Sequence, residues 1–161
     1  MATRLTHELT YDAPLAAVGE MLMDPAFREA VAEAMDVISA DVQLDRDGDG
    51  FSLVIDQLQK TDDLPGFART FAGDSTQAIQ REVWLSDTTG NLSIEAPGKP
   101  TKIGGTITLE PAGAGTTEVV ELEIKVKVPL IGGKLEKLMA EKVRSGMDRE
   151  QEIGTTWLKE H

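Results

Sequence analysis

The segment 116–161 constrains the fold most, because in it a long strand runs almost directly into the longest helical pattern of the chain. Apolar and charged residues alternate strictly over 120–128, which is typical of a strand with one buried and one solvent-facing side. Pro129 ends this strand, since proline cannot donate a ladder hydrogen bond. After Gly132 and Gly133, apolar residues recur every three or four positions, which predicts a helix of about 26 residues, roughly 39 Å long. Such a helix needs a whole sheet to pack against.

The sequence before this segment supplies the expected sheet. Residues 4–11 alternate like a first strand, and an aspartate cap closely followed by proline, at Asp12 and again at Asp24, predicts two short helices. Further strands separated by turn sequences are predicted at 37–44, 51–59, 78–86, 92–96 and 102–110.

The second short helix and the segment 61–77 carry more specific predictions. The second short helix is predicted to bury Phe27 and Val31 and to turn Arg28 to solvent. Residues 61–77 fit neither a helical nor a strand period. They are predicted to form an irregular loop carrying Phe67 and Phe71, either a lid over a cavity or a packed surface loop.

The order of these elements predicts the fold class. Sequential strands joined by short turns form an antiparallel meander, and only the terminal helix is long enough to cover its apolar concave face. The chain of 161 residues is one domain by size, and no linker or internal repeat divides it. We therefore expect a single α+β domain over 1–161, with a curved antiparallel sheet of about six to seven strands wrapped around the long helix.

The composition limits the classes of partner and the cellular compartment that we expect. The net charge of −12 disfavours nucleic acid and anionic lipid, because such a surface repels polyanions. No apolar run reaches the roughly 18 residues of a membrane span, so no integral membrane contact is expected. The absence of cysteine excludes disulfides, thiolate metal sites and cysteine nucleophiles. Together with a start that lacks an apolar signal region, it favours a cytoplasmic protein. No cofactor is predicted, and a protein partner is left open.

The element order resembles the START-like helix-grip (SRPBCC) superfamily, which includes polyketide cyclases, lipid-transfer domains and plant pathogenesis-related proteins. Residues 81–84 (Arg-Glu-Val-Trp), 128–136 (Val-Pro-Leu-Ile-Gly-Gly-Lys-Leu-Glu) and Trp157-Leu158 resemble an uncharacterised bacterial family within it. The resemblance covers the whole chain and implies a sheet gripping the helix, with a hydrophobic cavity between them. It implies no catalytic residue, because members share a cavity rather than a chemistry.

One motif points to a metal, but its context does not support that interpretation. Asp45, Asp47 and Asp49, with Asp56 at the twelfth position, have the spacing of an EF-hand calcium loop. That loop requires a helix on each side, whereas the flanking segments are predicted strands. The acidic stretch is therefore predicted to be a hairpin turn, and no metal site is expected.

Polar groups that could meet a ligand come from the first strand and the last helix. His7 and Tyr11 share the apolar face of the first strand, where packing is the default role and ligand contact the alternative. Lys142 and Glu150 lie about two turns apart near the inner stripe of the helix. Facing inward they would orient a head group or act as acid and base, but the favoured interpretation is that both reach solvent. Gly146, on the same stripe, either opens the cavity or admits a closely packed strand.

The orientation of the strand at 78–86 is left open by its sequence. Arg81 lies on one face and Trp84 on the other. Arg81 turned inward would pair with a carboxylate-bearing ligand, whereas Trp84 turned inward would make the cavity more aromatic.

The predicted function is binding or transport of a hydrophobic or amphipathic small molecule, such as a lipid or polyketide-like compound, between sheet and helix. A cyclase- or aromatase-like enzyme is one alternative, and it requires at least two of His7, Tyr11, Arg81 and Glu150 to converge. A protein-interaction module with a closed core and an exposed apolar patch is the other. The residues predicted to bind the ligand are His7, Tyr11, Phe51, Leu53, Ile55, Arg81, Leu122, Ile124, Leu138, Met139, Lys142, Gly146 and Met147.

Overall fold

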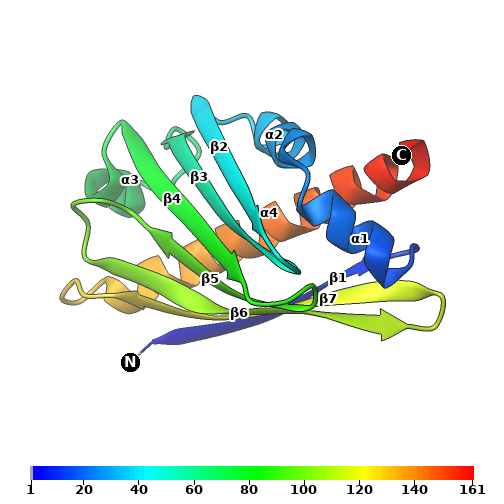
Figure 1. Ribbon diagram of the computed structural model, residues 1–161. Helices are drawn as coiled ribbons and strands as arrows, with labels where there is room; N and C mark the ends of the chain where they lie inside the picture. The colour runs from blue at the N-terminus through cyan, green and yellow to red at the C-terminus, as the bar shows by residue number, and fades with distance from the viewer. Residues whose placement is uncertain (1) are drawn as a thin grey trace.

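The structure, a computed structural model, describes residues 2–161. Its strands are β1 (Thr3–Tyr11), β2 (Ser39–Asp47), β3 (Gly50–Lys60), β4 (Ser75–Trp84), β5 (Thr89–Glu95), β6 (Thr101–Ala112) and β7 (Gly115–Val126). Its helices are α1 (Leu15–Leu22), α2 (Pro25–Ala34), α3 (Gly66–Ala72) and α4 (Gly132–Glu160), as Figure 1 shows.

The strands form one antiparallel sheet in the order β1-β7-β6-β5-β4-β3-β2. From β2 to β7, each strand pairs with the next one in sequence. Helices α1 and α2 carry the chain from β1 at one edge to β2 at the other, and the meander then returns until β7 pairs with β1. The predicted fold class, an α+β helix-grip with two short helices after the first strand, is confirmed.

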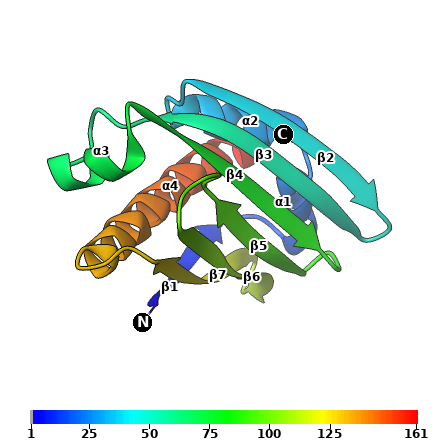
Figure 2. The ribbon, with the colours of Figure 1, turned by 90° about the vertical axis from the view of Figure 1, so that its left-hand side faces the viewer.

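The sheet curves around α4, which lies against its concave face (Figure 2). This helix has 29 residues, slightly more than predicted. Helices α1 and α2 lie near its C-terminal half, and α3 lies near its N-terminal half (Figure 1). The sheet is thus closed by helices at both ends, with α4 running between them. No helix within residues 2–161 is long and apolar enough to cross a membrane.

The alternation that predicts β7 is confirmed by burial. Val120, Leu122, Ile124 and Val126 are at most 4% exposed and face α4 or the core around it. The regular strand ends at Val126, shortly before Pro129, because the Val128 carbonyl already accepts a hydrogen bond from Gly132 N–H at the start of α4.

The prediction of an irregular loop over 61–77 is wrong in two respects. Residues Gly66–Ala72 form α3, and β4 begins at Ser75. A helix of about two turns is too short to show a clear period in the sequence. Its Ala68 is buried against Leu135 of α4 and Val126 of β7, so α3 is held by packing rather than by helix propensity.

Helix α4 touches the sheet closely at one glycine and stands off from it at another. A Cβ added to Gly154 would lie 2.6 Å from a ring carbon of Tyr11 and 3.1 Å from the methyl carbon of Met21. A Cβ added to Gly146 would meet only the end of the Met35 side chain, with the methyl carbon at 3.4 Å and the sulfur at 3.9 Å. Gly154 is therefore required for close packing, whereas Gly146 has only a flexible side chain near it.

This difference predicts opposite effects of the same substitution. Alanine gains about 1 kcal/mol of helix propensity over glycine at either position. In Gly154→Ala the methyl overlaps a buried ring, and such overpacking typically costs about 1–3 kcal/mol. In Gly146→Ala it meets a flexible methionine. Chemical denaturation should therefore give a free energy of unfolding at or above wild type for Gly146→Ala and below it for Gly154→Ala. Equal values for the two variants would contradict the close contact at Gly154.

Candidate functional site

A cavity of about 600 Å³ lies between the sheet and α4. This volume is within the range of small-molecule sites, roughly 300–1,000 Å³. Strands β3 to β7 and helices α2, α3 and α4 all contribute to its wall. Its apolar lining includes Val31, Met35, Ile55, Leu92, Ile94, Ile103, Ile107, Val120, Leu138, Met139, Val143 and Met147.

The end of the cavity next to α3 faces solvent. There Lys142 Nζ lies 2.6 Å from Asp63 Oδ2, and Lys60 Nζ lies 2.9 Å from Asp36 Oδ2. The lysine side chains of both pairs are about half exposed, so each pair contributes little to stability. These pairs form a polar rim around an apolar interior.

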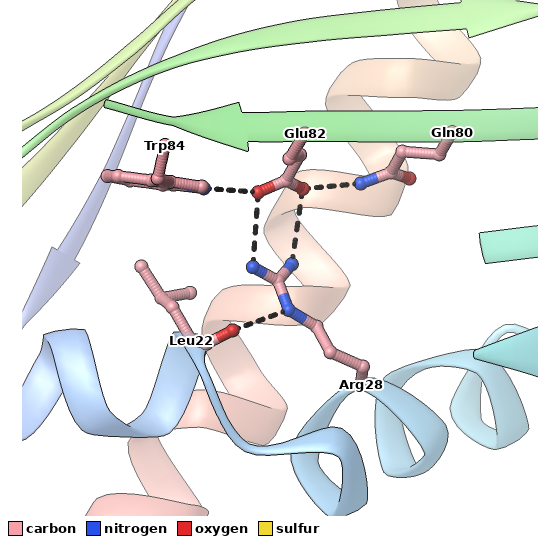
Figure 3. Close-up of polar contacts among 5 residues, drawn as sticks. All are labelled: Leu22, Arg28, Gln80, Glu82 and Trp84. Atoms are coloured by element: carbon pink, nitrogen blue, oxygen red, sulfur yellow. Dashed lines mark hydrogen bonds and ion pairs between the residues drawn. The ribbon is translucent and has the colours of Figure 1, made fainter. Parts of the chain in front are cut away.

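A buried ion pair joins α2 to β4 at the opposite end (Figure 3). Arg28 donates from its two Nη atoms to the two carboxylate oxygens of Glu82, at 3.3 and 3.1 Å. Its Nε donates to the Leu22 carbonyl at 2.9 Å. Glu82 also accepts from Trp84 Nε1 at 2.9 Å and from Gln80 Nε2 at 2.7 Å. The side chains of Arg28 and Glu82 are each 3% exposed, so these contacts replace water almost completely.

Local sequence places both partners of this pair. Asp24 caps α2 by accepting from Ala26 N–H, and Pro25 occupies the first position of the helix, so Arg28 lies close to its start. Along β4, alternation puts Glu82 on the same inward face as Trp84 and turns Arg81 outward. The helix start and the strand face therefore bring opposite charges together inside the molecule.

Two further carboxyl groups line the cavity beside this ion pair. They belong to Glu118 of β7 and Glu150 of α4. Glu118 is 4% exposed, and within residues 2–161 its Oε1 has no hydrogen-bond partner. The buried hydroxyl of Tyr11, which lies near both carboxyls, also lacks a partner in that part of the chain. The partly exposed surface of Glu150 faces the cavity that it lines.

Burial shifts the titration of these groups strongly. Burial raises the pKa of Glu150 to about 7, against the lowering effect of Arg28. Burial, reinforced by the charges of Glu150 and Glu82, raises the pKa of Glu118 well above its usual range. Burial and the charges of Glu150 and Glu118 also raise the pKa of Tyr11. The carboxyl pair therefore retains at least one proton near neutral pH, and the phenol is neutral.

Arg28 stays charged in this environment. Burial opposes its charge, but Glu82, Glu150 and Glu118 outweigh that effect and raise the pKa of the guanidinium. Three carboxyls thus converge on one guanidinium. Such a cluster can bind a cationic group, donate a hydrogen bond from a protonated carboxyl, or exchange a proton with a bound molecule.

The cavity is lined by only some of the residues predicted to bind a ligand. Those in the lining are Ile55, Leu138, Met139, Lys142, Gly146 and Met147. Phe51, Leu53, Leu122 and Ile124 are instead buried in the core next to it. Phe51 stacks on Trp84 with ring centroids 5.3 Å apart, which shows how completely that region is packed. These four residues therefore support the cavity without forming its wall.

The polar candidates on the strands also lie outside the cavity wall. His7 Nε2 lies 2.8 Å from Asp148 Oδ1, between β1 and α4. Arg81 faces outward and pairs with Glu95 at 3.0 Å, which settles the orientation of β4. Tyr11 packs behind the carboxyl cluster, against α4. Of the four groups whose convergence would favour an enzyme, the structure brings Tyr11 and Glu150 together.

Two sequence predictions about charged residues are wrong. Arg28 does not face solvent, because its guanidinium is drawn to Glu82. Glu150 does not turn to the outer surface either, because it lines the cavity, whereas Lys142 reaches solvent as predicted, with its side chain 47% exposed. Glu82 and Glu118 were missed as site residues. Their positions in the alternation carried the signal, since Glu118 shares a face with Val120 and Glu82 shares one with Trp84.

The acidic stretch forms the β2–β3 hairpin as predicted. Asp47 pairs with Gly50, and Gly48 adopts a φ of 60° in the turn. Asp56 lies within β3, opposite Asp41 of β2. In residues 2–161, no group of three or more His, Cys, Asp or Glu side chains is arranged to hold a metal ion.

Comparisons with known proteins agree with this architecture. A family model described as a protein of unknown function (DUF2505) matches residues 6–158. The chain is similar to the uncharacterized protein Rv0481c of Mycobacterium tuberculosis, with 26% identity over 108 residues. That alignment covers 63% of this chain and 62% of the relative, so the chain matches less than two thirds of its length.

Solved structures of low sequence identity share the fold. The protein TTHA0849 from Thermus thermophilus is 22% identical, with a TM-score of 0.65 over 94% of this chain and 96% of that one. A START superfamily protein from Mycobacterium smegmatis is 15% identical, with a TM-score of 0.61 over 96% and 98%. The di-domain ARO/CYC StfQ from the steffimycin biosynthetic pathway is 12% identical, with a TM-score of 0.67 over 99% of this chain and 51% of that one.

The buried ion pair predicts that removing its cation destabilises the protein strongly and that removing the anion as well restores part of the stability. Arg28→Met leaves the Glu82 carboxylate buried without a cation, which should cost about 3–5 kcal/mol of unfolding free energy. Adding Glu82→Gln should recover part of that loss, because the amide oxygen still accepts from Trp84 but carries no charge. Urea denaturation of the single and double variants checks this.

The exposed pair Arg81–Glu95 provides the matched control. Arg81→Met should cost less than about 1 kcal/mol, as is usual for a surface pair. If Arg28→Met were no more destabilising than Arg81→Met, the buried ion pair would not have the role described above.

Proposed function

The chain belongs to a family of proteins of unknown function (DUF2505) with the START-like helix-grip fold, and we propose that it binds a hydrophobic or amphipathic small molecule between the sheet and α4. The resemblance to an uncharacterised family is confirmed, and the solved structures share the fold expected of the superfamily. The observation that carries the proposal is the cavity of about 600 Å³ lined largely by aliphatic and methionine side chains. Close packing stabilises a folded chain, so an interior left this open favours a role for the space.

The proposed binding mode follows from the wall of the cavity. Ile55, Leu138 and Met139 would contact the apolar part of the ligand, and Met147 would adapt to its shape, since methionine is flexible. Gly146 would leave room for it beside α4. The ligand would enter at the rim between α3 and α4, where Lys142 and Asp63 are exposed.

An acid–base enzyme acting in the same cavity is the second candidate. It is favoured by one observation, that Glu150 has a pKa of about 7 and lies close to Tyr11, because a carboxyl that titrates near neutral pH can both take and give a proton. His7 and Arg81 do not add to that group. A protein-interaction module would require a closed core, and the open cavity favours ligand binding over it.

Native mass spectrometry of the protein purified from its source organism tests the proposal. We expect a compound that copurifies in stoichiometric amount and is released on denaturation. A carrier returns that compound unchanged after incubation, whereas an enzyme converts it into a product.

A cavity-filling variant provides an independent prediction. Gly146→Leu should weaken the uptake of a fluorescent fatty-chain probe roughly tenfold or more, because its side chain occupies the space that the probe needs. Glu141→Leu adds the same side chain at an exposed position of α4 and should bind as wild type does. A wild-type protein that neither copurifies with a compound nor takes up such probes would refute the binding function.

A further inference from the structure

The buried end of the cavity holds three acidic side chains and one cationic side chain. Glu82, Glu118 and Glu150 line it together with Arg28. Within residues 2–161, Arg28 is the only cationic side chain that is buried. It directs its hydrogen bonds at Glu82 and at the Leu22 carbonyl. The other two carboxyl groups share its field but are not its hydrogen-bond partners.

Two unsatisfied polar atoms mark the same place. Oε1 of Glu118 and the hydroxyl of Tyr11 are buried, and neither has a hydrogen-bond partner in the part of the chain that the structure describes. A buried polar group left without a hydrogen-bond partner destabilises the folded state. The two groups lie on strands that are neighbours in the sheet, with Tyr11 on β1 and Glu118 on β7. Because Glu118 lines the cavity, its unpartnered oxygen favours a polar group of the ligand at this end.

We propose that the ligand is an amphipathic amine, whose protonated nitrogen lies between Glu118 and Glu150 and whose apolar part extends along α4 toward α3. This rests on the proposed binding function and names the chemical class of its ligand. An ammonium group has three donors and no acceptor, and a carboxyl group that has given up its proton is an acceptor only. The ammonium group would take the place of the proton that the pair otherwise holds, so its charge would lie beside the carboxylate that it leaves ionised.

Other head groups fit the cluster less well. A carboxylate or phosphate head would add an anion to an acidic cluster whose one cation, Arg28, is already paired with Glu82. An alcohol or a ketone could accept a hydrogen bond from a protonated carboxyl, but it would offer no charge to the carboxylate that forms when Glu150 loses its proton. An ammonium head forms charge-assisted hydrogen bonds, which are roughly twice as strong as neutral ones.

The proposal gives binding a definite pH dependence. The groups that line the site are Arg28 from α2, Glu82 from β4, Glu118 from β7 and Glu150 from α4, and Tyr11 of β1 lies behind them. Arg28 stays charged and Tyr11 stays neutral, so the carboxyl groups are the ones that titrate. Because burial raises the pKa of Glu150 to about 7, an ammonium group that binds at lower pH must displace a proton.

The protonation of the carboxyl groups sets the direction in which amine affinity changes with pH. An aliphatic amine stays protonated up to a pKa of about 10, so between about pH 5 and 8 only the carboxyl side changes. Affinity for the amine should therefore rise with pH through this range and level off above it. Binding near pH 6 should release protons, which calorimetry in two buffers of different ionisation enthalpy measures directly.

The test compares three probes of equal chain length, dodecylamine, dodecanol and dodecanoate, below their micelle concentrations. Their affinities for the full chain are measured by displacement of a fluorescent probe. Glu118→Gln and Glu150→Gln remove one negative charge each at nearly constant volume. Glu121→Gln on β7 and Glu141→Gln on α4 are the matched controls, because both side chains are exposed on the same two elements.

Wild type should bind the amine most tightly and the carboxylate most weakly. Each cavity variant should bind the amine roughly tenfold more weakly or worse, with little change for the alcohol, and both controls should match wild type. In Glu150→Gln the rise of amine affinity with pH should also be reduced. The wild-type pH profile and proton release need no variant, so they test the proposal even if a variant folds poorly.

Three results would overturn the proposal. Amine and alcohol could bind equally in wild type, the carboxylate could bind best, or amine affinity could fall as pH rises. Each leaves the binding function intact, because a probe still enters the cavity. If none of the three probes bound at any pH, the binding function would fail and the amine proposal would fail with it.

Discussion

The Arg28–Glu82 ion pair determines what the interior of this molecule can contain. It joins α2 to β4 across the concave side of the sheet, and it supplies the positive charge beside which Glu118 is buried and Glu150 lines the cavity. The attraction between two buried charges seldom offsets their desolvation unless other hydrogen bonds satisfy them. Here Trp84, Gln80 and the Leu22 carbonyl do so. The result is a polar wall at one end of an otherwise apolar cavity.

Helix α4 sets the shape of the space in front of that wall. At Gly154 it lies so close to Tyr11 that a methyl group would overlap the ring. About two turns earlier, at Gly146, the helix borders the cavity instead. Helix α3 packs at the other end of the cavity, where Ala68 contacts α4 and β7. Helix α4 therefore packs closely against the core at Gly154 and forms part of the cavity wall at Gly146.

The sequence predicted the fold well because periodicity reports burial directly. Strict alternation over 120–128 and the long helical stripe after it defined the sheet, the helix and their contact. The site was predicted only in part. Met139 and Met147 line the cavity, but a buried arginine on α2 contradicts the pattern that normally places Arg28 outside. Its partner comes from β4, 54 residues along the chain, and no local pattern reveals such a pairing.

The most direct test of the acidic wall is the titration of individual carboxyl groups. Carbon-13 NMR of glutamate-labelled protein, with Glu118→Gln and Glu150→Gln to assign the signals, reports the protonation of each side chain against pH. We expect Glu150 to titrate near pH 7 and Glu118 to titrate well above the ordinary range of a glutamate. Titration of both groups near their ordinary pKa of about 4.3 would contradict this expectation, because the buried end of the cavity would then carry no protonated carboxyl at neutral pH.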